Sequence, residues 1–306
     1  MKKISRRKFI IDGITLTSLA FVLDACWLEQ FFIETNEFYL GEARKHGSNL
    51  KFIQISDLHL HSIGLQHKLL AEKINHINPD LLFFTGDSID RGKYMTLFEQ
   101  YLSLFDPHIL KVAILGNREY NRKISIEELK HVYARHNADL LINESKQYTV
   151  KGHTIAITGC DDFIGGDANF PLAVKNYIPS DYHIVLTHCP EHRDILQEEQ
   201  GQIPIDCILS GHTHGGQIRI LGFAPYTPEG SGRYVSGWYR ENACPPLYVS
   251  KGIGTTIWPI RFGARSEIAI FNFELKEKSK KRELGELDEQ KTIDHQQINK
   301  QSVYQT

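Results

Sequence analysis

Short apolar runs alternate with amphipathic helical patterns along the central part of the chain. Eight runs of strand length are rich in Val, Ile, Leu and aromatic residues; they span residues 50–56, 80–86, 108–116, 154–159, 182–188, 206–211, 246–252 and 267–275. Apolar residues at helical spacing predict four helices, over residues 65–77, 94–105, 125–136 and 191–199. Ser125 and Glu128 have capping-box spacing at the start of the third helix. Buried strands between helices predict an α/β fold in which helices cover sheet layers.

The chain divides into four segments by composition. Residues 50–275 contain no long linker and no internal repeat, so we expect a single domain there. Residues 27–49 are expected to form a linker or a lead-in strand. Residues 276–306 carry many charges and Gln with almost no bulky apolar side chains, which predicts a disordered or loosely helical tail.

The first 26 residues have the layout of an export signal, with five basic residues before an apolar run from Phe9 to Leu23. Residues 5–10 resemble the twin-arginine motif, which addresses folded proteins to a bacterial export machinery. The run is short for a transmembrane helix and is interrupted by Asp12, although an uncleaved segment would act as an anchor. We therefore expect export across, or anchoring in, the bacterial cytoplasmic membrane; a basic, disordered start is the alternative.

Five cysteines leave one without an internal partner. Cys26 directly follows the apolar run in a context that resembles a lipobox, although Asp24 fits it poorly, so lipidation and an ordinary thiol both remain open. The other four could pair in three ways in an oxidising compartment; they are Cys160, Cys189, Cys207 and Cys244. Three of these lie on or beside predicted buried strands, where a free cysteine acts as a small apolar residue. We expect thiols.

Size and charge narrow the possible partners. The 306 residues are 41% hydrophobic and 24% charged, which is enough for one large domain or two small ones. The formal net charge of −2 provides no overall basic field, so no nucleic acid partner is predicted.

Polar side chains that can bind metals follow five of the predicted strands. They are Asp57, His59, Asp87, Asn117, His188, His212 and His214. Each alone could be a helix cap, a turn residue or a packed ring. Together they suit two divalent ions, because strand ends on one side of a sheet share a crevice and the donors mix carboxylate, amide and imidazole. Without thiolates the set favours Mn²⁺, Fe or Zn²⁺, and a metal pair is what in-line attack on phosphorus uses.

These residues lie in five ordered motifs: DLH at 57–59, GD at 86–87, GN at 116–117, the isolated His188 and GHTHGG at 211–216. In this order they resemble the signature blocks of the calcineurin-like metallophosphoesterase family, over residues 50–274. GHTHGGQ, LYVSKGIGT and RFGARSEI are most similar to the bacterial exported or membrane-tethered phosphodiesterase branch, whose members often begin with a twin-arginine signal.

The resemblance implies a four-layer αββα sandwich of two mixed β-sheets flanked by helices, with two metal sites. One ion would be bound by Asp57, His59, Asp87 and His214, and the other by Asp87, Asn117, His188 and His212, with Asp87 bridging. The implied activity is dinuclear-metal-dependent hydrolysis of a phosphate ester or anhydride, of the phosphodiesterase or pyrophosphatase type, by a metal-bridging hydroxide. Manganese is the expected ion, with iron or zinc as alternatives, and the substrate could be lipid-linked.

Arg118 departs from the family pattern, which usually has His after GN. Arginine keeps its proton and is a poor general acid, but its fork can bind phosphoryl oxygens. We therefore hypothesise that the leaving group needs little protonation, or that His61 is the acid. The alternatives are a surface position for His61, and for Arg118 a salt bridge with Glu119 or a nearby acid.

Two other functions remain open. One is a UDP-2,3-diacylglucosamine diphosphatase of lipid A synthesis, which would suit Arg118 because the leaving group of that substrate is good. An export signal argues against this function. A non-catalytic scaffold would keep the fold alone, but loss of ligands marks that route and all seven are present. Aromatic residues between positions 221 and 246 either line a substrate groove or pack within their loop; they are Phe223, Tyr226, Tyr234, Trp238 and Tyr239.

Overall fold

The computed structural model describes residues 5–23, 29–41, 49–241, 244–256 and 258–275. Helix α1 (Arg6–Leu23) covers most of the predicted export signal. Among the described residues, no helix combines the length and apolar character that crossing a membrane requires. Cys26 and the tail over 276–306 lie outside the described residues.

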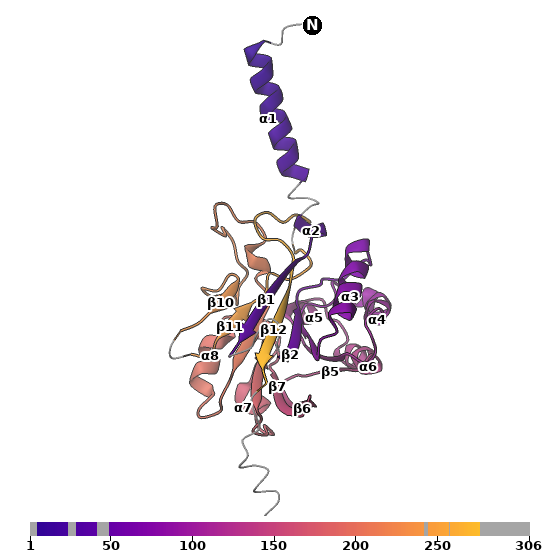
Figure 1. Ribbon diagram of the computed structural model, residues 1–306, viewed down its shortest axis with the longest axis vertical. Helices are drawn as coiled ribbons and strands as arrows, with labels where there is room; N and C mark the ends of the chain where they lie inside the picture. The colour runs from indigo at the N-terminus through magenta and orange to yellow at the C-terminus, as the bar shows by residue number, and fades with distance from the viewer. Residues whose placement is uncertain (1–4, 24–28, 42–48, 242–243, 257, 276–306) are drawn as a thin grey trace, which may run out of the picture. The chain divides into compact units, whose positions relative to one another are not determined.

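Two six-stranded sheets form the centre of the domain (Figure 1). The first sheet has the order β1 (Glu34–Leu40), β12 (Glu267–Glu274), β2 (Asn49–Ile55), β3 (Leu81–Thr85), β4 (Leu110–Ile114) and β5 (Ala138–Leu140). The second has the order β10 (Gly237–Tyr239), β11 (Leu247–Val249), β9 (Cys207–Ser210), β8 (Tyr182–Leu186), β7 (His153–Gly159) and β6 (Glu144–Val150). Both sheets are mixed, because β12 runs antiparallel to β2, and β10 and β6 run antiparallel to their neighbours.

Aromatic side chains join the two sheets face to face. The ring of Phe38 on β1 lies 5.0 Å from that of Tyr248 on β11. Phe271 on β12 contacts Tyr248 at 5.2 Å and Trp238 on β10 at 5.8 Å, again between ring centroids. Such offset and edge-to-face pairs supply much of the apolar contact between packed sheets.

Helices cover the outer face of each sheet. α3 (Leu65–Ile77), α4 (Met95–Leu102) and α6 (Ile126–Arg135) place buried apolar residues in one cluster with β2, β3 and β4, and Figure 1 shows these helices gathered together. On the second sheet, α7 (Phe170–Ala173) and α8 (His192–Glu199) pack Phe170 and Leu196 against Val185 and Ile208. The predicted sandwich of two mixed sheets flanked by helices is confirmed.

The eight predicted strands and four predicted helices are all present, with ends shifted by up to a few residues. The Ser125 hydroxyl caps α6 by accepting the Glu128 N–H at 3.2 Å. The cysteines at 160, 189, 207 and 244 are free thiols.

Of the two alternatives for residues 27–49, a linker or a lead-in strand, the strand is observed over residues 34–40. α2 spans Glu29–Phe31, and all seven residues of β1 pair in parallel with β12. β1 carries polar residues, and these also pair with β12 through their side chains. Asn36 donates to Glu267 at 2.5 Å, and Glu37 accepts from Asn272 at 2.9 Å. Residues 34–40 are therefore an edge strand of the first sheet.

Candidate metal centre

The seven metal-capable residues lie just beyond the carboxyl ends of β2, β3, β4, β8 and β9. Two groups of three bring their ligand atoms within 4.8 Å of one another: Asp57 with His59 and His214, and Asp57 with Asp87 and His188. In the first group, His214 Nε2 lies 3.4 Å from Asp57 Oδ1 and 3.1 Å from His59 Nε2. In the second, His188 Nε2 lies 3.5 Å from Asp87 Oδ1 and 4.0 Å from Asp57 Oδ1. Side chains from both sheets therefore converge on one place.

Asp87 lies between the two expected ligand sets. One carboxylate oxygen, Oδ2, lies 3.4 Å from His59 Nε2. The other, Oδ1, lies 3.5 Å from His188 Nε2 and accepts the backbone N–H of Arg118 at 2.7 Å. Each oxygen of this carboxylate thus faces a histidine from a different set.

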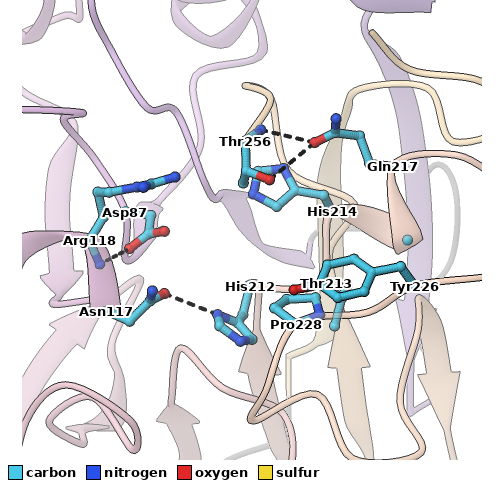
Figure 2. A pocket seen from close by; sticks show the side chains of 11 residues that line it. Asp87, Asn117, Arg118, His212, Thr213, His214, Gln217, Tyr226, Pro228 and Thr256 are labelled. Carbon is cyan, nitrogen blue, oxygen red and sulfur yellow. Dashed lines mark hydrogen bonds between the residues drawn. The ribbon is translucent and has the colours of Figure 1, made fainter. Parts of the chain in front are cut away.

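Backbone contacts orient two of the histidine rings. His212 Nε2 donates to the Glu229 carbonyl at 2.6 Å, so the lone pair of the ring is on Nδ1. His212 Nδ1 lies 3.1 Å from Asn117 Oδ1 (Figure 2). His188 Nδ1 donates to the Thr85 carbonyl at 2.8 Å, which turns Nε2 toward the carboxylates. A hydrogen bond of this kind on the second ring nitrogen is typical of metal-ligating histidines.

The donor set fits divalent cations. His188 Nε2 is fully buried and has no hydrogen-bond partner, which is costly unless a cation or proton occupies that direction. The Nε2 atoms of His59 and His214 face each other at 3.1 Å in a buried space next to two carboxylates. Buried carboxylates are stable when they are paired or coordinate metals.

The backbone at these residues is unusual. Asp57, His59, Asp87, His212 and His214 all have positive φ, between 44° and 73°. Residues other than glycine rarely adopt this region, and each instance costs on the order of 1–3 kcal/mol. Strain concentrated on five of seven candidates indicates that the surrounding fold holds them in place for a function.

Two glycines of the motifs allow close approach. A Cβ atom at Gly116 would overlap the Asp87 carboxylate, and one at Gly86 would overlap the His188 ring. Gly86 also has φ of 90°, which favours glycine. The glycines of GD and GN are therefore needed because the candidate metal-ligand side chains pack directly against their backbone.

Burial and mutual charge set the protonation of the site. Burial raises the pKa of Asp57 to about 6 and lowers the pKa of both His59 and His212 to about 4. Burial also opposes ionisation of Asp87, but the charge of the nearby His188 holds the pKa of this carboxyl well below its usual range. At neutral pH Asp57 and Asp87 are thus ionised, and His59 and His212 are neutral; these are the forms that bind metals.

Glu119, in the short helix α5 (Asn117–Asn121), has a role that the sequence did not reveal. Its Oε2 accepts the N–H groups of Gly116 at 2.9 Å and Asp87 at 3.2 Å, and its Oε1 accepts that of Ser88 at 2.8 Å. Burial, together with the charge of Asp87, raises its pKa to about 8. Glu119 therefore links the GD and GN loops through hydrogen bonds. The only feature of the sequence that pointed to this role was an acidic residue in the first turn after GN.

Arg118 lies at the wall of a cavity that four of the seven metal-capable residues line. This cavity, of about 240 Å³, is also lined by Asp87, Asn117, His212 and His214 (Figure 2). Of the salt bridges considered for Arg118, the one with Glu119 is not formed, because that carboxylate accepts backbone N–H groups, whereas an ion pair with a nearby acid is observed. Arg118 Nε instead lies 3.9 Å from Asp90 Oδ1 and has no hydrogen-bond partner.

His61 lies outside this cavity wall. It is exposed, its Nδ1 lies 3.1 Å from the carbonyl of His59, and it lines a neighbouring cleft that also contains Arg118. The surface position considered for His61 is therefore the one observed.

The five loop aromatics divide between the two expectations. Tyr226 lines the cavity, whereas Phe223 is 70% exposed. Tyr234 is fully buried, Trp238 packs between the sheets, and the Tyr239 hydroxyl accepts the N–H of Val235 at 2.7 Å. Loop and sheet packing thus accounts for three of the five.

Comparison with known proteins gives consistent matches. The family model described as calcineurin-like phosphoesterase matches residues 50–216. The uncharacterized protein YpbG of Bacillus subtilis is 33% identical over 78% of this chain and 86% of its own length. The uncharacterized metallophosphoesterase YkuE of the same organism is 29% identical over 89% and 98%, and the phosphodiesterase YaeI of Escherichia coli is 25% identical over 87% and 98%.

Proposed function

Because the chain belongs to the calcineurin-like phosphoesterase family, we propose that its metal centre is dinuclear and that it hydrolyses phosphodiesters or phosphoanhydrides. Members of this family are metal-dependent phosphoester hydrolases, and the Asp and His clusters described above suit that chemistry. The observation that carries the dinuclear proposal is Asp87, whose two oxygens face histidines of two different sets.

The proposed ligand sets share that carboxylate. One set is Asp57, His59, Asp87 and His214; the other is Asp87, Asn117, His188 and His212. Divalent ions held there would lower the pKa of a water molecule and offset charge on the phosphoryl oxygens. Manganese is the first candidate, and iron and zinc also suit oxygen and nitrogen donors.

Arg118 is proposed to hold the phosphoryl group. Its side chain lines the cavity, where a guanidinium can bind phosphoryl oxygens. Since arginine does not release its proton, it stabilises charge and donates none to the leaving group. Good leaving groups, such as the phosphate side of an anhydride or an aryl oxide, are therefore preferred.

The N-terminal segment is proposed to direct export. Apolar side chains of α1, including Phe9 at 72% and Leu16 at 69% exposure, are open to a membrane or an export receptor. Replacing Arg6 and Arg7 together by Lys should abolish appearance of the protein in the periplasmic or envelope fraction. Unchanged fractionation of this variant would remove the twin-arginine proposal.

The activity is tested on purified full-length protein that has been stripped of metal and reloaded with Mn²⁺, Fe²⁺ or Zn²⁺. Hydrolysis of bis(4-nitrophenyl) phosphate should be absent after chelation and should return with at least one ion. Persistent inactivity of protein that binds metal would favour the non-catalytic scaffold. Cleavage of UDP-2,3-diacylglucosamine, with release of UMP, would instead select the diphosphatase alternative.

A further inference from the structure

An apolar cleft of about 290 Å³ adjoins the metal cavity. The two spaces share four residues of their walls, and three more residues, all apolar, line the cleft alone. The shared residues are Gly216, Gln217, Tyr226 and Thr256, and those of the cleft alone are Ile218, Pro225 and Trp258. Because the walls are shared, a substituent on a phosphoryl group in the cavity can enter the cleft directly.

The chain between the lining residues Ile218 and Pro225, here called the rim, exposes large apolar side chains, as do Tyr226 and Trp258 of the cleft wall. Leu221 is 103% exposed, Phe223 70%, Trp258 65%, Tyr226 62% and Ile220 58%. Single exposed apolar residues are common, but several within one short loop beside a cavity indicate a binding surface.

Hydrogen bonds hold this rim in shape. Ile220 and Phe223 exchange two backbone hydrogen bonds, at 2.9 and 3.0 Å, around a tight turn whose tip residues have φ of 52° and 85°. Arg219 donates to the carbonyl of Gly222 at 3.1 Å and to the hydroxyl of Ser236 at 3.1 Å. The rim therefore needs little ordering when a ligand binds, which lowers the entropic cost of binding.

Gln217 braces the other wall of the cleft. Its side chain donates to the carbonyl of Trp258 at 2.8 Å and accepts the N–H of Thr256 at 2.9 Å. Figure 2 shows Gln217 and Tyr226 on the side of the cavity opposite Asp87 and Arg118. The apolar side of the cavity is thus built by a connected set of loop residues.

A second neighbouring cleft has the opposite character. It is lined by Arg91, Arg118 and Arg122 with one carboxylate, Asp90. A hydrocarbon group there would strip water from guanidinium groups without replacing their hydrogen bonds, which is unfavourable. An apolar substituent is therefore directed toward Tyr226 and Trp258.

We propose that the apolar cleft binds a hydrocarbon chain of the phosphoester substrate. This rests on the proposed hydrolysis and names its substrate class: an amphipathic phosphoester whose alkyl or acyl arm lies against Trp258 and Tyr226. The polar remainder lies toward the arginines. Each methylene group that enters the cleft leaves water, which favours longer chains.

The test compares 4-nitrophenyl alkyl phosphates from methyl to octyl, all with the same leaving group and below their micelle concentrations. In the full-length protein, kcat/KM should rise about threefold per methylene over the first few carbons. Trp258→Ser should lower the ratio of octyl to methyl kcat/KM about tenfold. Ile178→Ser, which changes an equally apolar side chain exposed by 55% elsewhere, should leave that ratio unchanged.

Binding to metal-free protein tests the cleft separately from the reaction. Octylphosphonate should bind more tightly than methylphosphonate in calorimetry, with a negative heat-capacity change that Trp258→Ser reduces. Equal affinity of the two phosphonates, or a chain-length effect untouched by Trp258→Ser, would overturn the cleft proposal. If no ester is hydrolysed but this binding pattern is found, the proposed function fails and the apolar site stands.

Discussion

The floor and the rim of the cavity differ in burial and in backbone support. On the floor, Asp87 and His214 are buried just beyond strand ends and have positive φ. On the rim and the cleft wall, Leu221, Phe223 and Trp258 are among the most exposed apolar residues described and belong to the loops before β10 and after β11. This difference indicates that floor residues carry out the reaction and that rim residues determine which substrates bind. Floor substitutions should therefore impair every substrate, whereas rim substitutions should affect substrates unequally.

The largest effect is expected from Asp87→Asn. Removing this charge leaves an amide where two histidines of different sets meet a carboxylate, so metal binding should fall together with turnover. The loss in kcat should exceed about 100-fold for all substrates. Mutating residues that only hydrogen-bond to metal ligands already lowers metal affinity or activity by about 10–100-fold. Metal analysis and hydrolysis of bis(4-nitrophenyl) phosphate measure both. Glu127→Gln, at a side chain exposed by 86%, is the matched control and should change neither.

Arg118→Ala should come next, with a loss of kcat on the order of 100-fold, as for removal of one donor to a developing negative charge. Arg118→His restores a group that can donate a proton. We expect it to flatten the dependence of rate on leaving-group pKa, measured with a graded series of aryl phosphodiesters. If the slope of rate against leaving-group pKa is the same in both proteins, proton donation at position 118 does not account for any difference between Arg and His.

Glu119→Gln should have a smaller effect that still extends to every substrate. The amide nitrogen cannot accept from the three N–H groups that the carboxylate now binds, so one or two of these become unsatisfied. Metal affinity should fall about 10–100-fold, and stability should fall by about 1–3 kcal/mol. Metal titration and thermal unfolding are the measurements. Because Glu119 does not face the substrate, KM for short and long esters should change by the same factor; unequal changes would contradict a purely positioning role.

His61→Ala should have the smallest effect, because the ring is exposed and contacts the backbone of its own segment. A loss of less than about threefold is expected for aryl substrates, whose leaving groups need little protonation. A loss that grows steeply as leaving groups become more basic would instead identify His61 as the acid.

Much of the fold followed from local patterns. Apolar runs of strand length and helical periodicity located the main strands and helices, since those signals reside in neighbouring residues. For β1 the local pattern left a linker and a strand equally open, because its polar residues are satisfied by Glu267 and Asn272, more than 230 positions away along the chain. Long-range pairing of this kind leaves no mark in a local window.

Some residues of the site could be predicted from the sequence and others could not. Seven metal-capable residues at strand ends could be named from spacing, and the structure brings them together from both sheets. The role of Glu119 could not be named, because it depends on backbone N–H groups of two separate loops. The apolar cleft was anticipated in part, since Tyr226 was among the aromatics considered for a substrate groove, whereas Ile218, Pro225 and Trp258 form a wall only after the loops fold back.

The most direct test is anomalous X-ray diffraction from crystals of the metal-loaded protein, recorded at the absorption edge of the bound metal. A dinuclear centre that shares Asp87 should give two peaks about 3.5–4 Å apart, each in contact with a different oxygen of Asp87. A single peak, or two peaks with Asp87 bound to only one of them, would contradict the shared carboxylate on which the dinuclear centre depends.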